Sequence, residues 1–437
     1  MTKQVIFIIV TLIAAGVFIY SASIIFANIK LLKKAYPVKD HAKRFKMLLD
    51  IGIGQTKIMR FPIIGFLHAL VFWGFLVILF GSAEMLIDGL TGQERILSFL
   101  GVIYDILMAL GDIFAYIIGV LIIVFLFRRL FLHIKRFAGV EMNHKNHIDA
   151  NFALSLILLL MISLAMMNIA YIQTGSDIKG IYPISSFLAK IITFDTETAH
   201  MVYEASWWTH IILIFFFANY LPYSKHFHVF LSLPNVYLSR LTPLTQMTNM
   251  ESVTKEVKIM MDPNQAFASP EPSEEEEEIE RFGMKDVEDG TWKMYFDSLT
   301  CTQCGRCTSV CPANQTGKLL SPRKVVKNFR ERMSEKAAGL RKDRNYDDGK
   351  SLLGDFITAE ELWACTTCNA CAQECPVNID HPSIILEMRR YIFMEESGAP
   401  SLLNSMSTNI ENNGAPWQYP PSDRLKWADD ITIEINN

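Results

Sequence analysis

All eight cysteines of this 437-residue chain lie in two runs that repeat one pattern. The first run contains Cys301, Cys304, Cys307 and Cys311, and the second contains Cys365, Cys368, Cys371 and Cys375. In each run, two residues separate each of the first three cysteines, three residues precede the fourth, and a proline follows it. Three thiolates at this spacing can bind three irons of one [4Fe–4S] cube. The repeated pattern therefore predicts two [4Fe–4S] clusters.

The proline after each fourth cysteine turns the chain away, so that the fourth thiolate serves the cluster of the other run. We therefore assign one cluster to Cys301, Cys304, Cys307 and Cys375. The other cluster takes Cys365, Cys368, Cys371 and Cys311. A pair of structural zinc sites is the alternative, but such sites usually show two separated CxxC pairs. No cysteine lies outside the runs, which argues against a disulfide framework and for a reducing compartment.

Histidines in apolar segments form a second group of residues that could bind a cofactor. An ionisable side chain within a membrane segment is costly, and for that reason it usually marks a function. Haem b can be held by two imidazoles on facing helices at one depth, and His68 and His228 satisfy this requirement. His210 lies 18 residues before His228, which is five whole helical turns, and suits a second haem. The expected position of its partner, residues 77–79, holds no histidine, which leaves His200 as a candidate.

Five apolar stretches are long enough to cross a bilayer, which requires about 20 residues. They cover residues 5–29, 61–81, 103–127, 152–172 and 207–230. Hydrophobic residues make up 51% of the chain, which is high for a soluble protein. The first stretch is too long for the apolar part of a signal peptide. We expect an all-α fold, with a five-helix transmembrane bundle followed by a mainly helical dicluster ferredoxin-like domain.

Basic residues predict the orientation of the bundle. Fourteen Lys and Arg residues lie in the first and third loops, whereas the loops on the other side hold Arg95, Lys179 and Lys190. Loops rich in Lys and Arg remain in the cytoplasm. We therefore expect a multi-pass protein of the cytoplasmic membrane, with the N-terminus outside and the cysteine runs inside.

Changes of composition predict four parts of the chain. Residues 1–231 form the membrane part, 232–283 a connector with an acidic linker at 269–278, 284–396 the dicluster domain, and 397–437 a tail for partner contact. Ser321 and Pro322 can start a helix whose apolar face carries Val325, Val326, Phe329 and Met333. Thr358 and Glu361 have the spacing of a capping box. The net charge of −4 implies no general attraction to nucleic acid.

The five spans with His68, His210 and His228 resemble the gamma subunit of respiratory nitrate reductase, a family of two-haem, quinol-oxidising cytochromes b. Residues 66–75, 207–210 and 221–228 are similar to a branch in which such a cytochrome is fused to a heterodisulfide-reductase-like iron–sulfur domain. The first cysteine run and residues 321–324 are similar to that branch as well. Relatives in it carry further cysteine-rich CCG domains, whereas here no cysteine follows Cys375. The resemblance therefore implies a separate CCG-domain iron–sulfur subunit.

The resemblance implies a membrane-bound electron-transfer subunit of a quinone oxidoreductase. Electrons would pass between a cytoplasmic partner, the two clusters, haem b and menaquinone or another quinone. The partner would be the CCG subunit or a flavoprotein such as electron-transfer flavoprotein. Two alternatives remain open: a quinol-oxidising subunit that feeds a heterodisulfide- or sulfite-type reductase, and a haem-free membrane anchor for a ferredoxin. The chain has no nucleophile–base pair that would indicate further substrate chemistry of its own.

Overall fold

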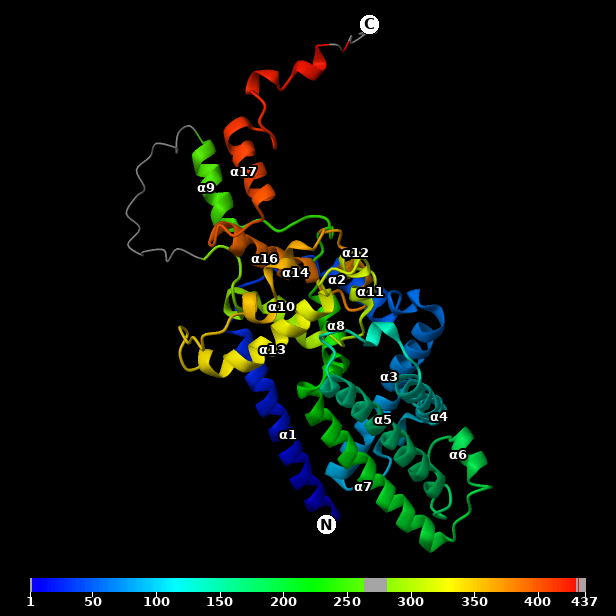
Figure 1. Cartoon of the computed structure of the whole chain (residues 1–437). Coiled ribbons are helices and arrows are strands. Elements are labelled where there is room, and N and C mark those ends of the chain that lie inside the picture. The colour runs from blue at the N-terminus through cyan, green and yellow to red at the C-terminus, as the bar shows by residue number, and fades with distance from the viewer. Residues whose placement is uncertain (1, 263–280, 430, 432–437) are drawn as a thin grey trace.

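The computed structural model of the chain describes residues 2–262, 281–429 and 431 (Figure 1). Within these ranges the regular elements are helices, and the only β-pairing consists of two isolated bridges. Five long helices form a bundle, and a smaller helical domain lies at one end of it. The predicted fold class is therefore confirmed. The predicted acidic linker at 269–278 lies outside the described residues.

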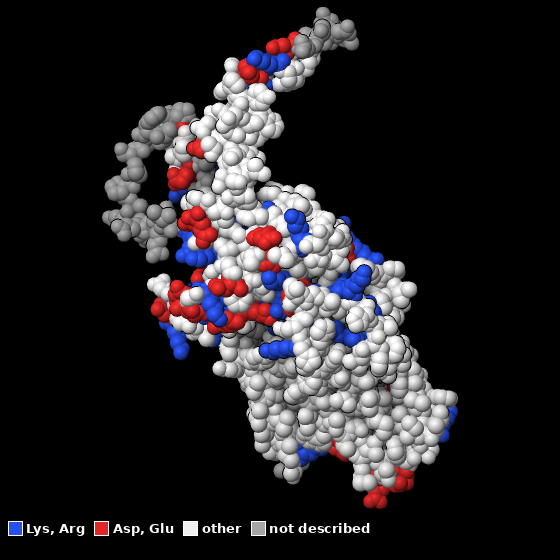
Figure 2. All heavy atoms as spheres, in the orientation of Figure 1, with Lys and Arg blue, Asp and Glu red and all other residues white. Residues whose placement is uncertain are grey.

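The bundle consists of five helices, each long and apolar enough to cross a membrane. They are α1 (Thr2–Ile29), α3 (Pro62–Thr91), α4 (Val102–Phe131), α5 (His144–Tyr171) and α7 (Thr196–Tyr220). Many of their large apolar side chains face outward, such as Leu12 and Ile63, which are 66% and 75% exposed. Figure 2 shows that Lys, Arg, Asp and Glu are nearly absent from the visible middle of the bundle. Such a surface suits lipid rather than water.

Small residues allow the bundle helices to approach one another closely. A Cβ atom at Gly74 of α3 would lie 2.5 Å from the ring of Phe114 and 3.0 Å from Ile118, both on α4. Helices in membranes associate mainly by close packing, because lipid is as apolar as their side chains. Gly74 therefore fixes the contact between α3 and α4, which positions His68 on the same helix.

The fifth long helix ends earlier than the sequence predicts. It stops at Tyr220 and is followed by two short turns, η5 (Leu221–Tyr223) and η6 (Lys225–Phe227), and then by α8 (His228–Tyr237). Pro222 has no N–H to donate, and Ser224 is extended and accepts a hydrogen bond from the His226 N–H (3.1 Å). The prediction of one continuous helix over 207–230 is therefore wrong. His210 and His228 lie on different helices, so their five-turn spacing does not align them.

We call residues 284–396 the cluster domain. Its helices are α10 (Trp292–Thr300), α11 (Arg306–Ser309), α12 (Pro312–Gln315), α13 (Pro322–Leu340), α14 (Ala359–Trp363), α15 (Ala370–Glu374) and α16 (His381–Met394). The predicted start of α13 is confirmed, because Ser321 caps it and Pro322 lies in its first turn. The predicted capping box of Thr358 and Glu361 is present at α14. The predicted apolar face of α13 is fully buried and supplies much of the core.

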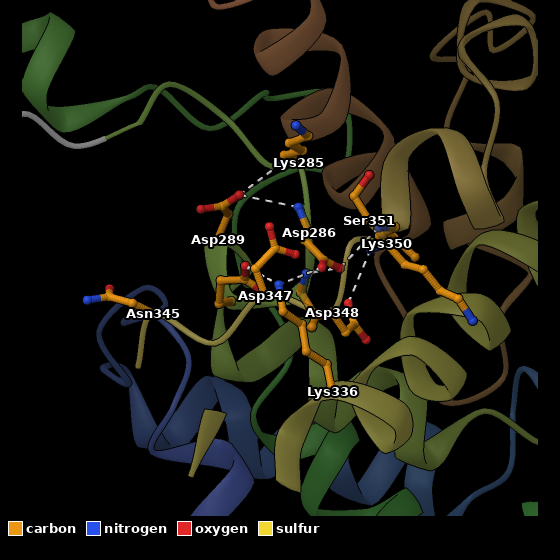
Figure 3. Close-up of polar contacts among 12 residues, drawn as sticks. Lys285, Asp286, Asp289, Lys336, Asn345, Asp347, Asp348, Lys350 and Ser351 are labelled. Atoms are coloured by element: carbon orange, nitrogen blue, oxygen red, sulfur yellow. Dashed lines mark hydrogen bonds and ion pairs between the residues drawn. The ribbon is translucent and has the colours of Figure 1, made fainter. Parts of the chain in front are cut away.

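A buried charged network holds the start of the cluster domain against α13 (Figure 3). Asp286 accepts hydrogen bonds from Arg332 (2.6 and 2.9 Å) and Lys336 (2.8 Å). Arg332 is fully buried and also pairs with Asp348 (2.7 Å). Because each buried charge has a partner, the network joins residues 284–290 and 343–352 to one helix.

The remaining elements are short or peripheral. They are α2 (His41–Met47), η1 (Leu48–Ile53), η2 (Ile58–Arg60), η3 (Ile96–Leu100), η4 (Lys135–Phe137), α6 (Pro183–Leu188), α9 (Glu251–Met261), η7 (Val287–Asp289), η8 (Leu352–Phe356), α17 (Ser401–Asn413), η9 (Pro421–Asp423) and η10 (Lys426–Ala428). The elements α17, η9 and η10 extend away from the cluster domain, on the side opposite the bundle (Figure 1). None of the residues of α17 is buried.

Candidate functional site

The two cysteine runs form loops with the same backbone conformation. In the first run Gln303 and Gly305 have φ of 56° and 74°, and in the second Thr367 and Asn369 have φ of 52° and 59°. These pairs occupy equivalent places beside the second cysteine of each run. Left-handed conformations at alternate positions curl each loop tightly. The sequence repeat is therefore also a structural repeat.

One cavity of the cluster domain is lined by thiols from both runs. Three of them, Cys301, Cys304 and Cys307, come from the first loop, and the fourth is Cys375 from the second. This is the set that the spacing assigns to one cluster. We call it the first cysteine set. Three of these cysteines are buried, and Cys304 is half-buried.

The other four cysteines also gather in one place. The thiol of Cys371 interacts electrostatically with those of Cys365, Cys311 and Cys368. We call these four residues the second cysteine set. Cys368 is exposed, in contrast to every member of the first set. The second set therefore reaches the surface of the cluster domain, whereas the first set is enclosed.

The cysteines supply the donors that an iron–sulfur cluster needs. Burial raises the pKa of Cys301 to about 11 and that of Cys375 to about 12, so a cation must stabilise their thiolate forms. Bound iron provides such a charge, because metal coordination deprotonates a thiol. Among the described residues, no three His, Cys, Asp or Glu side chains are arranged as ligands of a single metal ion. The donor set fits a multi-iron cluster through its four thiols and the cavity between them.

The structure brings His68 and His228 together at the end of the bundle that carries the cluster domain. The break after α7 makes His228 the first residue of α8, and its imidazole interacts electrostatically with that of His68 on α3. His228 Nδ1 lies 3.4 Å from the carbonyl oxygen of Lys225, while the buried Nδ1 of His68 has no hydrogen-bond partner. Burial lowers the pKa of His228 to about 4, so its ring is neutral at physiological pH. A neutral, oriented imidazole fits a haem ligand.

His210 is buried in the bundle, at 2% exposure. Its Nδ1 lies 3.0 Å from the carbonyl oxygen of Leu160 and 2.9 Å from the hydroxyl of Ser163, both on α5. His200 is exposed and is the fifth residue of the same helix, ten residues before His210. Ten residues of helix span about 15 Å, so His200 cannot face His210 across the bundle. The candidate pairing of His210 with His200 is therefore wrong.

Three buried or half-buried arginines join the cluster domain to the bundle, and sequence reasoning missed them. Arg306 donates to the carbonyl oxygens of Lys57 (2.9 Å) and Ile58 (3.1 Å). Arg323 donates to two carbonyl oxygens of the loop before α5 and pairs with Glu141 of that loop (2.7 Å). Arg330 donates to the carbonyl oxygens of residues 222 and 224. The sequence signal for Arg306 was its position between two cysteine ligands.

Gly305 lies where the first cysteine loop approaches the bundle closely. A Cβ atom at this position would collide with the carbonyl oxygen of Arg136, in the loop between α4 and α5. Its φ of 74° also favours glycine. The first cysteine loop therefore rests directly on the bundle.

Comparison with known proteins agrees with the cysteine chemistry. The 4Fe-4S dicluster domain family matches residues 297–379. The probable iron-sulfur-binding oxidoreductase FadF of Bacillus subtilis is 29% identical over 98% of this chain and 61% of its own length. The EtfAB:quinone oxidoreductase of Syntrophomonas wolfei is 26% identical over 89% of this chain and 54% of its own length. A probable membrane-anchored ferredoxin of Chromohalobacter salexigens is 33% identical over 35% of this chain and 25% of its own length.

The chain thus spans between half and two thirds of the length of the first two relatives. No solved structure matches it. The chain is homologous to iron–sulfur oxidoreductases and contains a 4Fe–4S dicluster domain.

Proposed function

We propose that this homologue of iron–sulfur oxidoreductases is the membrane-bound electron-transfer subunit of a quinone oxidoreductase. It would connect a cytoplasmic iron–sulfur or flavoprotein partner with quinone in the membrane. One observation supports this proposal most directly. The first cysteine set rests on the end of the bundle where His68 and His228 meet.

Each cofactor has a proposed set of protein ligands. The first cysteine set holds one [4Fe–4S] cluster and the second cysteine set holds the other. His68 and His228 hold haem b, and His210 is a candidate ligand of a second haem. When bound, these groups accept and release electrons, while the protein orients them and sets their potentials. Burial of the first set excludes water from its thiolates, and hydrogen bonding at Nδ1 fixes the ring of His228.

The exposed ligand of the second set indicates where a redox partner binds. Cys368 is exposed, and it belongs to the set that does not line the enclosed cavity. We propose that the partner approaches the second set, with the described part of the tail, such as α17, as a further contact. The relatives include an oxidoreductase named for EtfAB, which supports electron-transfer flavoprotein as one candidate partner.

The charges support a proposed orientation of the bundle. Figure 2 shows Lys and Arg gathered at the end of the bundle that carries the cluster domain. By the positive-inside rule, that end faces the cytoplasm, and the N-terminus of α1 faces outside. The cysteines then lie in a reducing compartment, where thiols remain available as ligands.

The function can be tested with the full chain purified in detergent. We expect the reduced-minus-oxidised spectrum to show a b-type haem, and EPR of the reduced protein to show two interacting [4Fe–4S] clusters. His68→Ala and His228→Ala should each remove the haem that these two residues hold and so lower the haem content, whereas His200→Ala should retain it. A reduced menaquinone analogue should reduce the haem of the wild type.

Each result separates the proposal from an alternative. A wild-type protein with clusters but without haem would be the haem-free ferredoxin anchor. Retention of the full wild-type haem content in His68→Ala would exclude the proposed ligand pair. The meeting of an imidazole from α3 with one from α8 favours the haem-binding form over the anchor.

A further inference from the structure

Arg306 occupies the space between the first cysteine set and the bundle. It lies between Cys304 and Cys307 in the sequence, begins α11, and is 6% exposed. Its guanidinium group donates to the carbonyl oxygens of Lys57 and Ile58 and lies 4.5 Å from the centre of the Phe61 ring. These contacts hold the positive charge at the start of α3.

The same guanidinium group interacts electrostatically with the site of each proposed cofactor. On the cluster side its partners include Cys304 and Cys375, which both line the cavity of the first set. On the bundle side the charge reaches the imidazole of His68. The backbone explains why Arg306 lies near His68. Arg306 binds the carbonyl group of Ile58, Gly65 packs on that same carbonyl group, and His68 follows Gly65 by three residues on α3.

We infer that Arg306 is a positioning residue that raises the reduction potentials of both the first cluster and the haem. The inference rests on the proposed function, because it requires a cluster at the first cysteine set and a haem at His68. Reduction adds negative charge to either group, and a fixed cation nearby stabilises the reduced form. Water screens this charge little, because the side chain is buried.

The charges around Arg306 do not cancel this effect. Glu374 is the carboxylate that faces it, at 3.9 Å, and Glu374 also pairs with Arg60 at 3.4 Å. Lys57 donates to the carbonyl oxygen of Cys375 (3.3 Å), which adds a second cation beside the first set. The local charge is therefore positive on balance, and Arg306 is the member of the group that interacts electrostatically with His68.

The second cysteine set has its own arginine, which provides a matched control. Arg389 donates to the carbonyl oxygens of Leu362 (2.6 Å) and Cys365, and its charge interacts with the Cys365 thiol. It stacks on Trp363 at 5.0 Å, much as Arg306 stacks on Phe61. Arg389→Gln therefore removes the same charge from a similar setting beside the other cluster.

The experiment is a potentiometric titration of the full chain in detergent, with EPR for the clusters and visible absorbance for the haem. We expect Arg306→Gln to shift the midpoint potentials of the first cluster and the haem to more negative values. Arg306→Lys keeps the charge and should remain closer to the wild type, although it loses the two-carbonyl contact. Arg389→Gln should shift the second cluster and leave the haem unchanged.

Unchanged haem and cluster potentials in Arg306→Gln would overturn the inference, as would equal shifts in Arg306→Gln and Arg306→Lys. If Arg306→Gln loses the first cluster, its haem is compared with that of Cys304→Ser, which lacks the cluster but keeps the arginine. The inference then requires the more negative haem potential in Arg306→Gln. Failure of the proposed function is seen separately, as a wild-type protein without haem or without clusters, and it would overturn this inference as well.

Discussion

Breaking the buried ion pair between Arg323 and Glu141 should weaken the attachment of the cluster domain to the bundle. The two side chains are 1% and 2% exposed and lie 2.7 Å apart. Glu141 also accepts a hydrogen bond from Ser321 (2.7 Å), so the carboxylate contacts the cap of α13 as well. Glu141→Gln would leave the buried guanidinium group without its counter-charge.

The size of the effect follows from this burial. Removing one partner of a buried pair costs about 3–5 kcal/mol. At roughly 2–4 °C per kcal/mol for a unit of a few hundred residues, the midpoint of thermal unfolding should fall by roughly 6–20 °C. The exposed pair of Lys3 and Glu204, at 2.6 Å with side chains 45% and 42% exposed, provides a control. Glu204→Gln should cost about 0–1 kcal/mol.

The assay is thermal unfolding in detergent, followed by the visible absorbance of the clusters. If Glu141→Gln lowers the midpoint no more than Glu204→Gln does, the buried pair does not stabilise the attachment. The double variant Glu141→Gln/Arg323→Met should lose less than the sum of the two single changes, because it removes the uncompensated charge. An additive double variant would show that the two side chains do not stabilise one another.

The same pair predicts a dependence on pH. Burial raises the pKa of Glu141, but Arg323 and Ser321 outweigh it and hold that pKa below its ordinary value. A lowered pKa in the folded state stabilises the protein above the ordinary glutamate value, and this stabilisation is lost as the pH falls through the lowered value. Glu141→Gln should therefore flatten the acid side of the stability curve.

Three further changes test other parts of the structure. Gly305→Ala should remove the first cluster and spare the second, since its Cβ atom collides with the carbonyl of Arg136; EPR distinguishes the two clusters. Cys368→Ser should remove the second cluster and lower bound iron by about half, as measured by iron analysis. Asp286→Asn should destabilise the cluster domain by about 3–5 kcal/mol in denaturant titrations, because Arg332 loses a buried carboxylate partner. Burial raises the pKa of Asp286, but Arg332 outweighs the effect of burial and holds that pKa below the ordinary value. The stability of the Asp286→Asn variant should therefore fall less at acid pH than that of the wild type.

Local patterns predicted the parts of the fold that depend on neighbouring residues. The cap at Ser321 and the capping box of Thr358 and Glu361 were readable because their hydrogen bonds join residues three positions apart. The buried face of α13 was readable because a helix repeats every 3.6 residues. The spans were readable because only long apolar helices satisfy their backbone within lipid.

The errors arose where a local signal was overruled or where partners are far apart in the sequence. The predicted alignment of His210 with His228 assumed one continuous helix. Pro222 lies between them, and a proline interrupts the backbone hydrogen bonds that a continuous helix needs. Glu141 and Arg323 lie 182 residues apart, and no spacing rule connects them. The loops rich in Lys and Arg predicted the orientation of the bundle. They gave no indication that Glu141, which lies in one of them, pairs with the buried Arg323.

The helix α8 belongs to both halves of the molecule. Its first residue, His228, meets His68, and near its other end Asn235 donates to Asp297 and to the carbonyl oxygen of Val377, both at 2.9 Å. A fragment that ends at residue 231 would cut this helix. The two halves are therefore not interchangeable modules. A ferredoxin domain grafted from another protein would need a surface matched to α8, or it would disturb the histidine pair from a distance.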